Sequence, residues 1–171
     1  IAGDGIDQDC DGEDAIGGCL DPSALNFDEM ATIDNGNCLY EVIFRVDLAL
    51  ESNPSGELWE LMECELWITD SADVDFQNAS ALLPTNSAWQ VAQFAVSLGT
   101  QPLGYRFVRP DGVTEDYPRF LTLQEGGGNV DLGAVCFNLG GPCPGCTDPM
   151  DVGYNPWSGS DSMCQGWSVA G

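Results

Sequence analysis

A short cysteine-closed unit occurs twice in this 171-residue chain and limits how those two stretches can fold. Residues 18–40 and 145–166 both begin Gly-Cys-x-Asp-Pro, and both end two residues after a second cysteine. A unit of about twenty residues cannot bury a core of its own, so it needs a covalent link. We therefore predict the disulfides Cys19–Cys38 and Cys146–Cys164, each stabilising the fold by about 3 kcal/mol through chain entropy.

The eight cysteines, in a chain without histidine, indicate disulfides rather than zinc. A cysteine-only zinc site needs two close cysteine pairs, and only Cys143 and Cys146 form one. An even number of cysteines in a Gly- and Pro-rich chain is typical of an oxidising, extracellular setting. Cys64 and Cys136 both fall in predicted strands, which favours a bond between them. Cys10 and Cys143 then join each other or neighbouring molecules; alternatively, Cys136 and Cys143 pair locally.

An aspartate-rich run over residues 4–14 has the spacing of a calcium-binding loop. Carboxylates at every second position, followed by Gly12, let the chain wrap a hard cation and turn sharply. Gly18 stands where an EF-hand would need its bidentate glutamate, so we expect a static clamp rather than a sensor. The predicted ligands in this run are Asp4, Asp7, Asp9, Asp11 and Asp14.

Both cysteine-closed units also carry side-chain oxygens of the kind that calcium prefers. The predicted ligands are Asp21, Asn26, Asp28 and Asp34 in the first unit and Asp148 and Asp161 in the second. The alternative is that these side chains only form Asp-Pro and Asx turns with the local backbone. Ca²⁺ is the cofactor that the sequence predicts.

Between the two units, residues 41–139 alternate apolar and polar side chains as one-sided β-strands do. Six strand candidates, separated by Gly/Pro/Asn turns, predict an all-β, immunoglobulin-like β-sandwich. The candidates are 42–50, 57–69, 88–98, 103–109, 117–123 and 130–139. Part of the second, 57–67, also fits a helix. The chain thus divides into 1–17, 18–40, 41–139 and 140–171.

The charge balance excludes several classes of function. With 28 acidic residues against 4 basic ones, the net charge of −24 disfavours nucleic acid and anionic membranes as partners. No stretch is apolar enough for membrane insertion. Without histidine or lysine, Ser-His-Asp triads and Schiff-base chemistry are impossible. No convergent catalytic set is visible among the many acids, so we expect no enzyme.

These motifs resemble parts of large secreted surface proteins of Bacteroidota. The first unit is similar to their Gly-Cys-Thr-Asp-Pro-x-Ala-x-Asn-Tyr repeats, and the aspartate run looks like the calcium motifs of thrombospondin type 3 and MopE-like proteins. Val-x-Phe-x-Val-Asp at 42–47, Gly-Tyr-Arg-Phe at 104–107 and Arg-Phe-Leu-Thr at 119–122 resemble a sandwich akin to starch-binding modules. The resemblance implies secretion, and Asp-Ser-apolar triplets imply O-glycosylation at Ser71 and Ser162. Separately, Asn78-Ala79-Ser80 fits the N-glycosylation pattern.

Two functions fit these features. The first is a structural subunit of an extracellular fibre or adhesin stalk, in which calcium and disulfides stabilise head-to-tail contacts between copies of the chain. The alternative is a carbohydrate-binding module that grips glycans through Trp59, Trp67 and Trp89. The competing interpretation of these tryptophans is that they pack the core.

Overall fold

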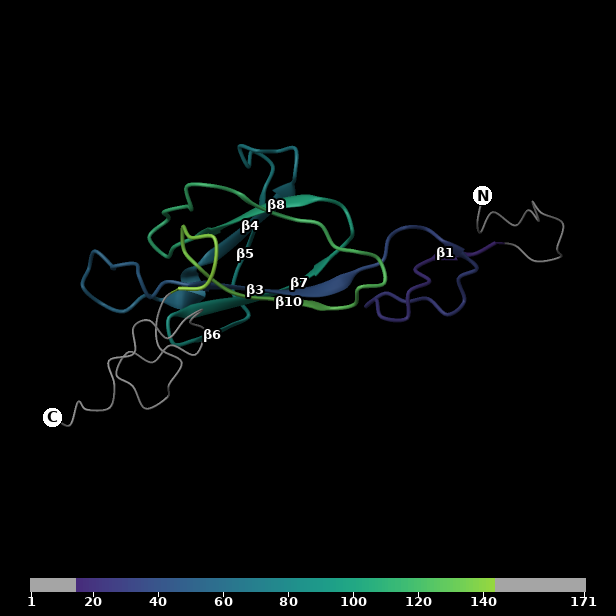
Figure 1. The fold of residues 1–171 in the computed structure, drawn as a ribbon, viewed down its shortest axis with the longest axis horizontal. Coiled ribbons are helices and arrows are strands. Elements are labelled where there is room, and N and C mark those ends of the chain that lie inside the picture. The colour runs from purple at the N-terminus through teal and green to yellow at the C-terminus, as the bar shows by residue number, and fades with distance from the viewer. Residues whose placement is uncertain (1–14, 144–171) are drawn as a thin grey trace.

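The computed structural model describes residues 15–143, which form a β-sandwich with a small cysteine-closed unit at one end (Figure 1). One sheet has the strand order β10 (Val130–Cys136), β3 (Tyr40–Asp47), β7 (Val91–Leu98) and β6 (Asn86–Ala88). The other has the order β5 (Ser80–Leu82), β4 (Glu65–Asp70), β8 (Leu103–Val108) and β9 (Arg119–Leu121). The predicted all-β sandwich is therefore confirmed.

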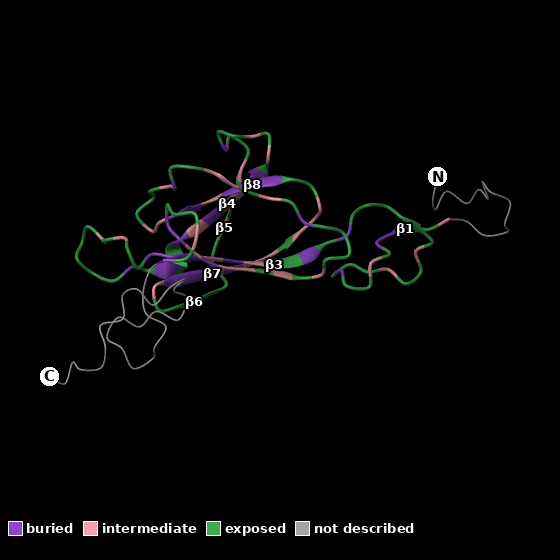
Figure 2. Cartoon of the chain, viewed as in Figure 1, coloured by how far each residue is buried: buried purple, intermediate pink, exposed green. Residues whose placement is uncertain are grey.

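The core lies between the two sheets, where the period-two pattern of the sequence turns alternate side chains inward. Phe44 of β3 meets Tyr105 of β8 edge to face, with their ring centroids 4.9 Å apart. Phe94 of β7 and Phe107 of β8 make a second contact across the sheets, at 5.8 Å. Figure 2 shows buried residues concentrated on the strands, whereas the connecting loops are mostly exposed. Burial of these aromatic side chains is the main force that holds the sheets together.

Strand pairing centres on β3, which runs antiparallel to β7 along its whole length and parallel to β10. The pairing with β10 is interrupted between Asp131 and Ala134, where the register shifts. The edge strands β5, β6 and β9 have only three residues each. Short or bulged edges offer few free backbone groups, which protects a sheet from pairing with other chains.

The first cysteine-closed unit has little regular structure. Its strands β1 (Gly17–Gly18) and β2 (Ile33–Asp34) form a two-residue parallel pair. The predicted Cys19–Cys38 disulfide is present, and both cysteines are buried. At Gly18 a Cβ would lie 2.8 Å from that of Ala31, so only glycine fits there.

Two sequence predictions about the sandwich are wrong. The stretch 57–69 is not one strand: β4 begins at Glu65, and the preceding residues form a loop with a 3₁₀ turn, η1 (Leu61–Glu63). The favoured Cys64–Cys136 bond is absent, because Cys136 is bonded to Cys143 and Cys64 is a buried free thiol. The chain reverses just after β10, at Asn138 with φ of 60°, and brings Cys143 back beside Cys136. Cys136 pairs with Cys143 because the turn brings their Cα atoms to 4.6 Å, within the range that a disulfide requires.

Two short strands, β5 and β6, lie in the connection between β4 and β7 and were not predicted. Three-residue strands leave too little alternation to be recognised in a sequence. Within residues 15–143, no helix is long and apolar enough to cross a membrane.

Candidate functional site

The first unit is fixed to the sandwich through the carboxylate of Asp21. Its Oδ2 atom accepts hydrogen bonds from the hydroxyl of Tyr40, the first residue of β3, and from the backbone N–H of Gly126 at 2.9 Å. Its Oδ1 atom accepts from the backbone and hydroxyl of Ser23, at 2.9 and 2.7 Å. These bonds, that from Tyr40 foremost, lower the pKa of Asp21 to about 2. Asp21 is thus an ionised anchor at neutral pH.

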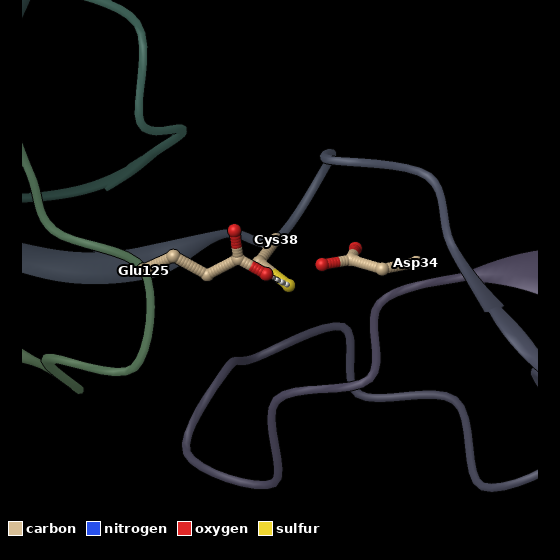
Figure 3. A group of neighbouring side chains, drawn as sticks. All are labelled: Asp34, Cys38 and Glu125. Atoms are coloured by element: carbon tan, nitrogen blue, oxygen red, sulfur yellow. Dashed lines mark hydrogen bonds between the residues drawn. The ribbon is translucent and has the colours of Figure 1, made fainter.

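Beside this anchor, two carboxylates meet across the boundary between the unit and the sandwich. Asp34 belongs to the unit, and Glu125 belongs to the loop between β9 and β10 (Figure 3). A hydrogen bond between the two side chains raises the pKa of Glu125 and lowers that of Asp34. Asp21 adds a further negative charge that acts on both groups. Such a pair is stabilised by a shared proton or, equally, by a bound cation.

The sulfur of Cys38 lies in the same cluster but cannot act as a ligand. Ligand-type atoms of Asp34, Cys38 and Glu125 all lie within 4.8 Å of one another. The dashed line in Figure 3 joins the Cys38 sulfur to Glu125 Oε1 at 4.0 Å. Because Cys38 is bonded to Cys19, its sulfur has no proton to donate and no thiolate to offer a metal. The cluster therefore offers carboxylate oxygens alone, which suit a hard cation such as Ca²⁺.

The other ligands predicted in the first unit make local hydrogen bonds. Asn26 donates to the carbonyl of Asn37 and accepts from the N–H of Leu39, both at 2.7 Å. Asp28 accepts from the N–H of Met30 at 2.9 Å, as an Asx turn does. These contacts match the turn-capping alternative. Of the predicted ligands in this unit, Asp34 is the one that hydrogen-bonds another carboxylate.

Glu125 escaped sequence reasoning because no motif surrounds it. It precedes the glycine run 126–128, one of the turns expected between the strands. The parallel pairing of β10 with β3 carries this loop back to the start of β3, where the first unit joins the sandwich. Pairing of this kind cannot be read from local sequence.

Several predicted site residues lie outside the described range 15–143, so the structure places none of them. They are the ligands Asp4, Asp7, Asp9, Asp11, Asp14, Asp148 and Asp161, the cysteines Cys10, Cys146 and Cys164, and the glycosylation candidate Ser162.

The three tryptophans proposed for glycan stacking do not share a face. Trp59 is buried in the core, where its indole N–H donates to the carbonyl of Glu51 at 3.1 Å. Trp67 is half-buried on the outer face of β4, in one sheet. Trp89 is 61% exposed in the turn between β6 and β7, in the other sheet. The core-packing interpretation holds for Trp59, and no common stacking surface is formed.

The two described glycosylation candidates lie in the connection between β4 and β5. Asn78 is exposed, and its N–H donates to Asp73 Oδ2 at 2.9 Å. Ser71 is half-buried and donates its N–H to the carbonyl of Pro102 at 3.2 Å. The Asn78 side chain is thus the more accessible acceptor of the two.

At the other end of the sandwich, Glu115 and Arg119 form a buried ion pair. The side chain of Glu115 is 1% exposed, and its Oε1 atom lies 2.5 Å from Nη2 of Arg119. The same carboxylate accepts from the N–H groups of Phe107 and Asn138 at 3.1 and 3.0 Å. Both residues line a surface pocket of 280 Å³ that also includes Tyr117 and Leu139. Both oxygens of Glu115 accept hydrogen bonds from three separate segments, which indicates a structural role.

Comparison with known proteins assigns the chain to no family. No protein-family model matches the chain, and no curated protein matches its sequence.

Proposed function

We propose that this protein is a structural subunit of an extracellular surface assembly, stabilised by calcium and disulfides and built from copies of the chain. The observation that carries this proposal is the junction of the first unit with the sandwich. A disulfide-closed unit is anchored there by Asp21 and sets the carboxylate of Asp34 against that of Glu125. Anchored, stapled modules of this kind suit repeated head-to-tail contact, because such contacts polymerise when they do not close into a ring.

Calcium is the proposed cofactor. The chain carries a net charge of −24, which opposes both folding and association at low ionic strength. A cation bound between Asp34 and Glu125 would relieve the repulsion at the junction. Any cation that binds only the folded state also adds stability by mass action. The aspartate run 4–14 would supply a second site by the spacing of its carboxylates.

An extracellular location is supported by the two disulfides, Cys19–Cys38 and Cys136–Cys143. Disulfides persist in oxidising compartments and are rare in reducing ones. A structural role also agrees with the chemistry of the sandwich. The buried carboxylate of Glu115 accepts hydrogen bonds from two backbone N–H groups and from Arg119.

The calcium part of the proposal is tested by thermal unfolding with and without millimolar Ca²⁺. We expect Ca²⁺ to raise the Tm of the wild type, and the double variant Asp34→Asn, Glu125→Gln to lose part of that increase. Asp116→Asn in the loop after β8 and Glu57→Gln in the loop before β4, both exposed carboxylates at the other end of the sandwich, form the charge-matched control. If Ca²⁺ raises the Tm of both double variants equally, Ca²⁺ does not bind between Asp34 and Glu125.

A further inference from the structure

Arg106 differs from the other three arginines of the chain. Arg45, Arg109 and Arg119 each form a salt bridge with a carboxylate. Within the described residues, Arg106 has no such partner, and its Nε atom is buried without a hydrogen-bond acceptor. The chain has 28 acidic residues for 4 basic ones, so a positive charge without a carboxylate is unusual here. Buried guanidinium N–H groups are costly unless something accepts from them.

The surroundings of Arg106 form an aromatic platform on the outer face of the β5-β4-β8-β9 sheet. Its guanidinium carbon lies 4.2 Å from the ring centroid of Phe76, in cation–π contact. Trp67 of β4 stands directly opposite Arg106 in the strand register. One row along, Phe120 of β9 pairs with Gly104, and the rings of Phe76 and Phe120 both lie against that glycine. Phe120 is 60% exposed, so the platform reaches solvent.

This arrangement pre-orients Arg106 for a carboxylate. Stacking on Phe76 fixes one face of the planar guanidinium, and the terminal Nη N–H groups, unlike the buried Nε, are the ones left to form a bidentate pair with a carboxylate. Glu65, two residues before Trp67 on the same face of β4, accepts instead from the indole N–H of Trp67 at 2.7 Å. Arginine and aromatic residues together are the composition of interface hot spots.

We propose that this platform, formed by Trp67, Phe76, Arg106 and Phe120, docks a carboxylate of a second copy of the chain. The assignment rests on the proposed function, because it names one contact of the assembly. Charge complementarity selects the occupant: two molecules of charge −24 repel each other except where positive charge is locally unneutralised. Among the described arginines, Arg106 provides that place. Every copy offers many carboxylates to it.

The test is sedimentation velocity of the purified full chain in millimolar Ca²⁺ over a range of protein concentrations. We expect Arg106→Gln to raise the concentration needed for half-assembly by about tenfold or more, as loss of a charge-assisted pair predicts. Arg45→Gln is the matched control, since it makes the same charge change on the other sheet, and it should assemble like the wild type. Phe120→Ala removes part of the platform without changing charge and should also weaken assembly. It keeps the test decisive if Arg106→Gln fails to fold.

Each outcome has a distinct meaning. If Arg106→Gln and Phe120→Ala assemble at the wild-type concentration, the docking contact is overturned while the proposed function stands. A wild type that stays monomeric contradicts the proposed function and this contact together. An acidic glycan is the other source of carboxylates, so oligogalacturonate is tested on the monomer. If it binds through Arg106 while assembly is unchanged in the variant, the second-copy assignment is overturned.

Discussion

At the scale of single residues, Glu115 shows how this acidic chain uses a buried carboxylate. Its oxygens join the backbone of β8, the side chain of Arg119 in β9 and the backbone after β10. Arg119 in turn donates to the carbonyls of Cys136 and Leu139, at 3.2 and 2.7 Å. One ion pair therefore fastens three segments that are separate in the sequence.

Replacement of Glu115 by glutamine should destabilise the fold by about 3 kcal/mol, because it leaves the charge of Arg119 without its partner. The measurement is the free energy of unfolding from urea denaturation. Asp116→Asn is the control: this neighbouring side chain is exposed, and we expect a change within about 0.5 kcal/mol. Equal losses in the two variants would contradict a structural role for Glu115.

The free thiol of Cys64 should be unreactive in the native protein. Burial raises the pKa of this thiol to about 12, so the nucleophilic thiolate is scarce at neutral pH and also shielded. We expect iodoacetamide to label Cys64 only after denaturation without reductant, as peptide mapping would show. Recovery of Cys64 in a peptide disulfide-linked to Cys136 would instead restore the pairing that the sequence favoured.

At the scale of elements, the first unit depends on its disulfide far more than the sandwich does. Its buried residues before Tyr40 are few: Gly18, Cys19, Ala24 and Cys38. The double variant Cys19→Ser, Cys38→Ser should lose about 3 kcal/mol of local stability. Limited proteolysis should then cut within residues 15–39 while the sandwich survives. The variant Cys136→Ser, Cys143→Ser should leave that region protected, and equal cleavage there in both variants would refute the dependence.

The contact between the unit and the sandwich should depend on acid pH. The pKa of Asp21 in the folded state, about 2, is below its ordinary value of 3.8. The stabilisation from its ionised form is therefore complete above about pH 4 and is lost as pH falls through 2. Tyr40→Phe removes the largest cause of the shift, so the pKa of Asp21, followed by NMR, should rise toward 3.8. Tyr117→Phe, an exposed tyrosine elsewhere, is the control. An unchanged pKa in Tyr40→Phe would exclude the hydroxyl as the anchor.

Sequence patterns predicted the strands and the first unit better than the tertiary contacts between them. The alternation around Phe44 and Phe107 predicted long inward-facing strands, and the Gly-Cys-x-Asp-Pro motif predicted the Cys19–Cys38 bond. The Cys136–Cys143 bond was one of the pairings that the sequence left open, whereas the Asp34–Glu125 pair and the Arg106 platform depend on which strands pair. Those features arise from tertiary packing, which local periodicity does not record.

At the scale of the whole molecule, charge governs the behaviour that we propose. The net charge is −24, and three of the four arginines are already paired with carboxylates inside the molecule. Copies of such a chain associate only if cations or local positive charge offset the repulsion. Calcium bound at the carboxylate clusters would supply the cations, and Arg106 would supply the local positive charge at the contact between copies.

Electron microscopy of the purified protein tests the central claim most directly. The same preparation is imaged in millimolar Ca²⁺, after chelation, and after chelation with reductant. The account predicts ordered filaments in Ca²⁺, partial disassembly after chelation, and complete loss when the disulfides are also reduced. Single particles of one size in all three conditions would contradict it.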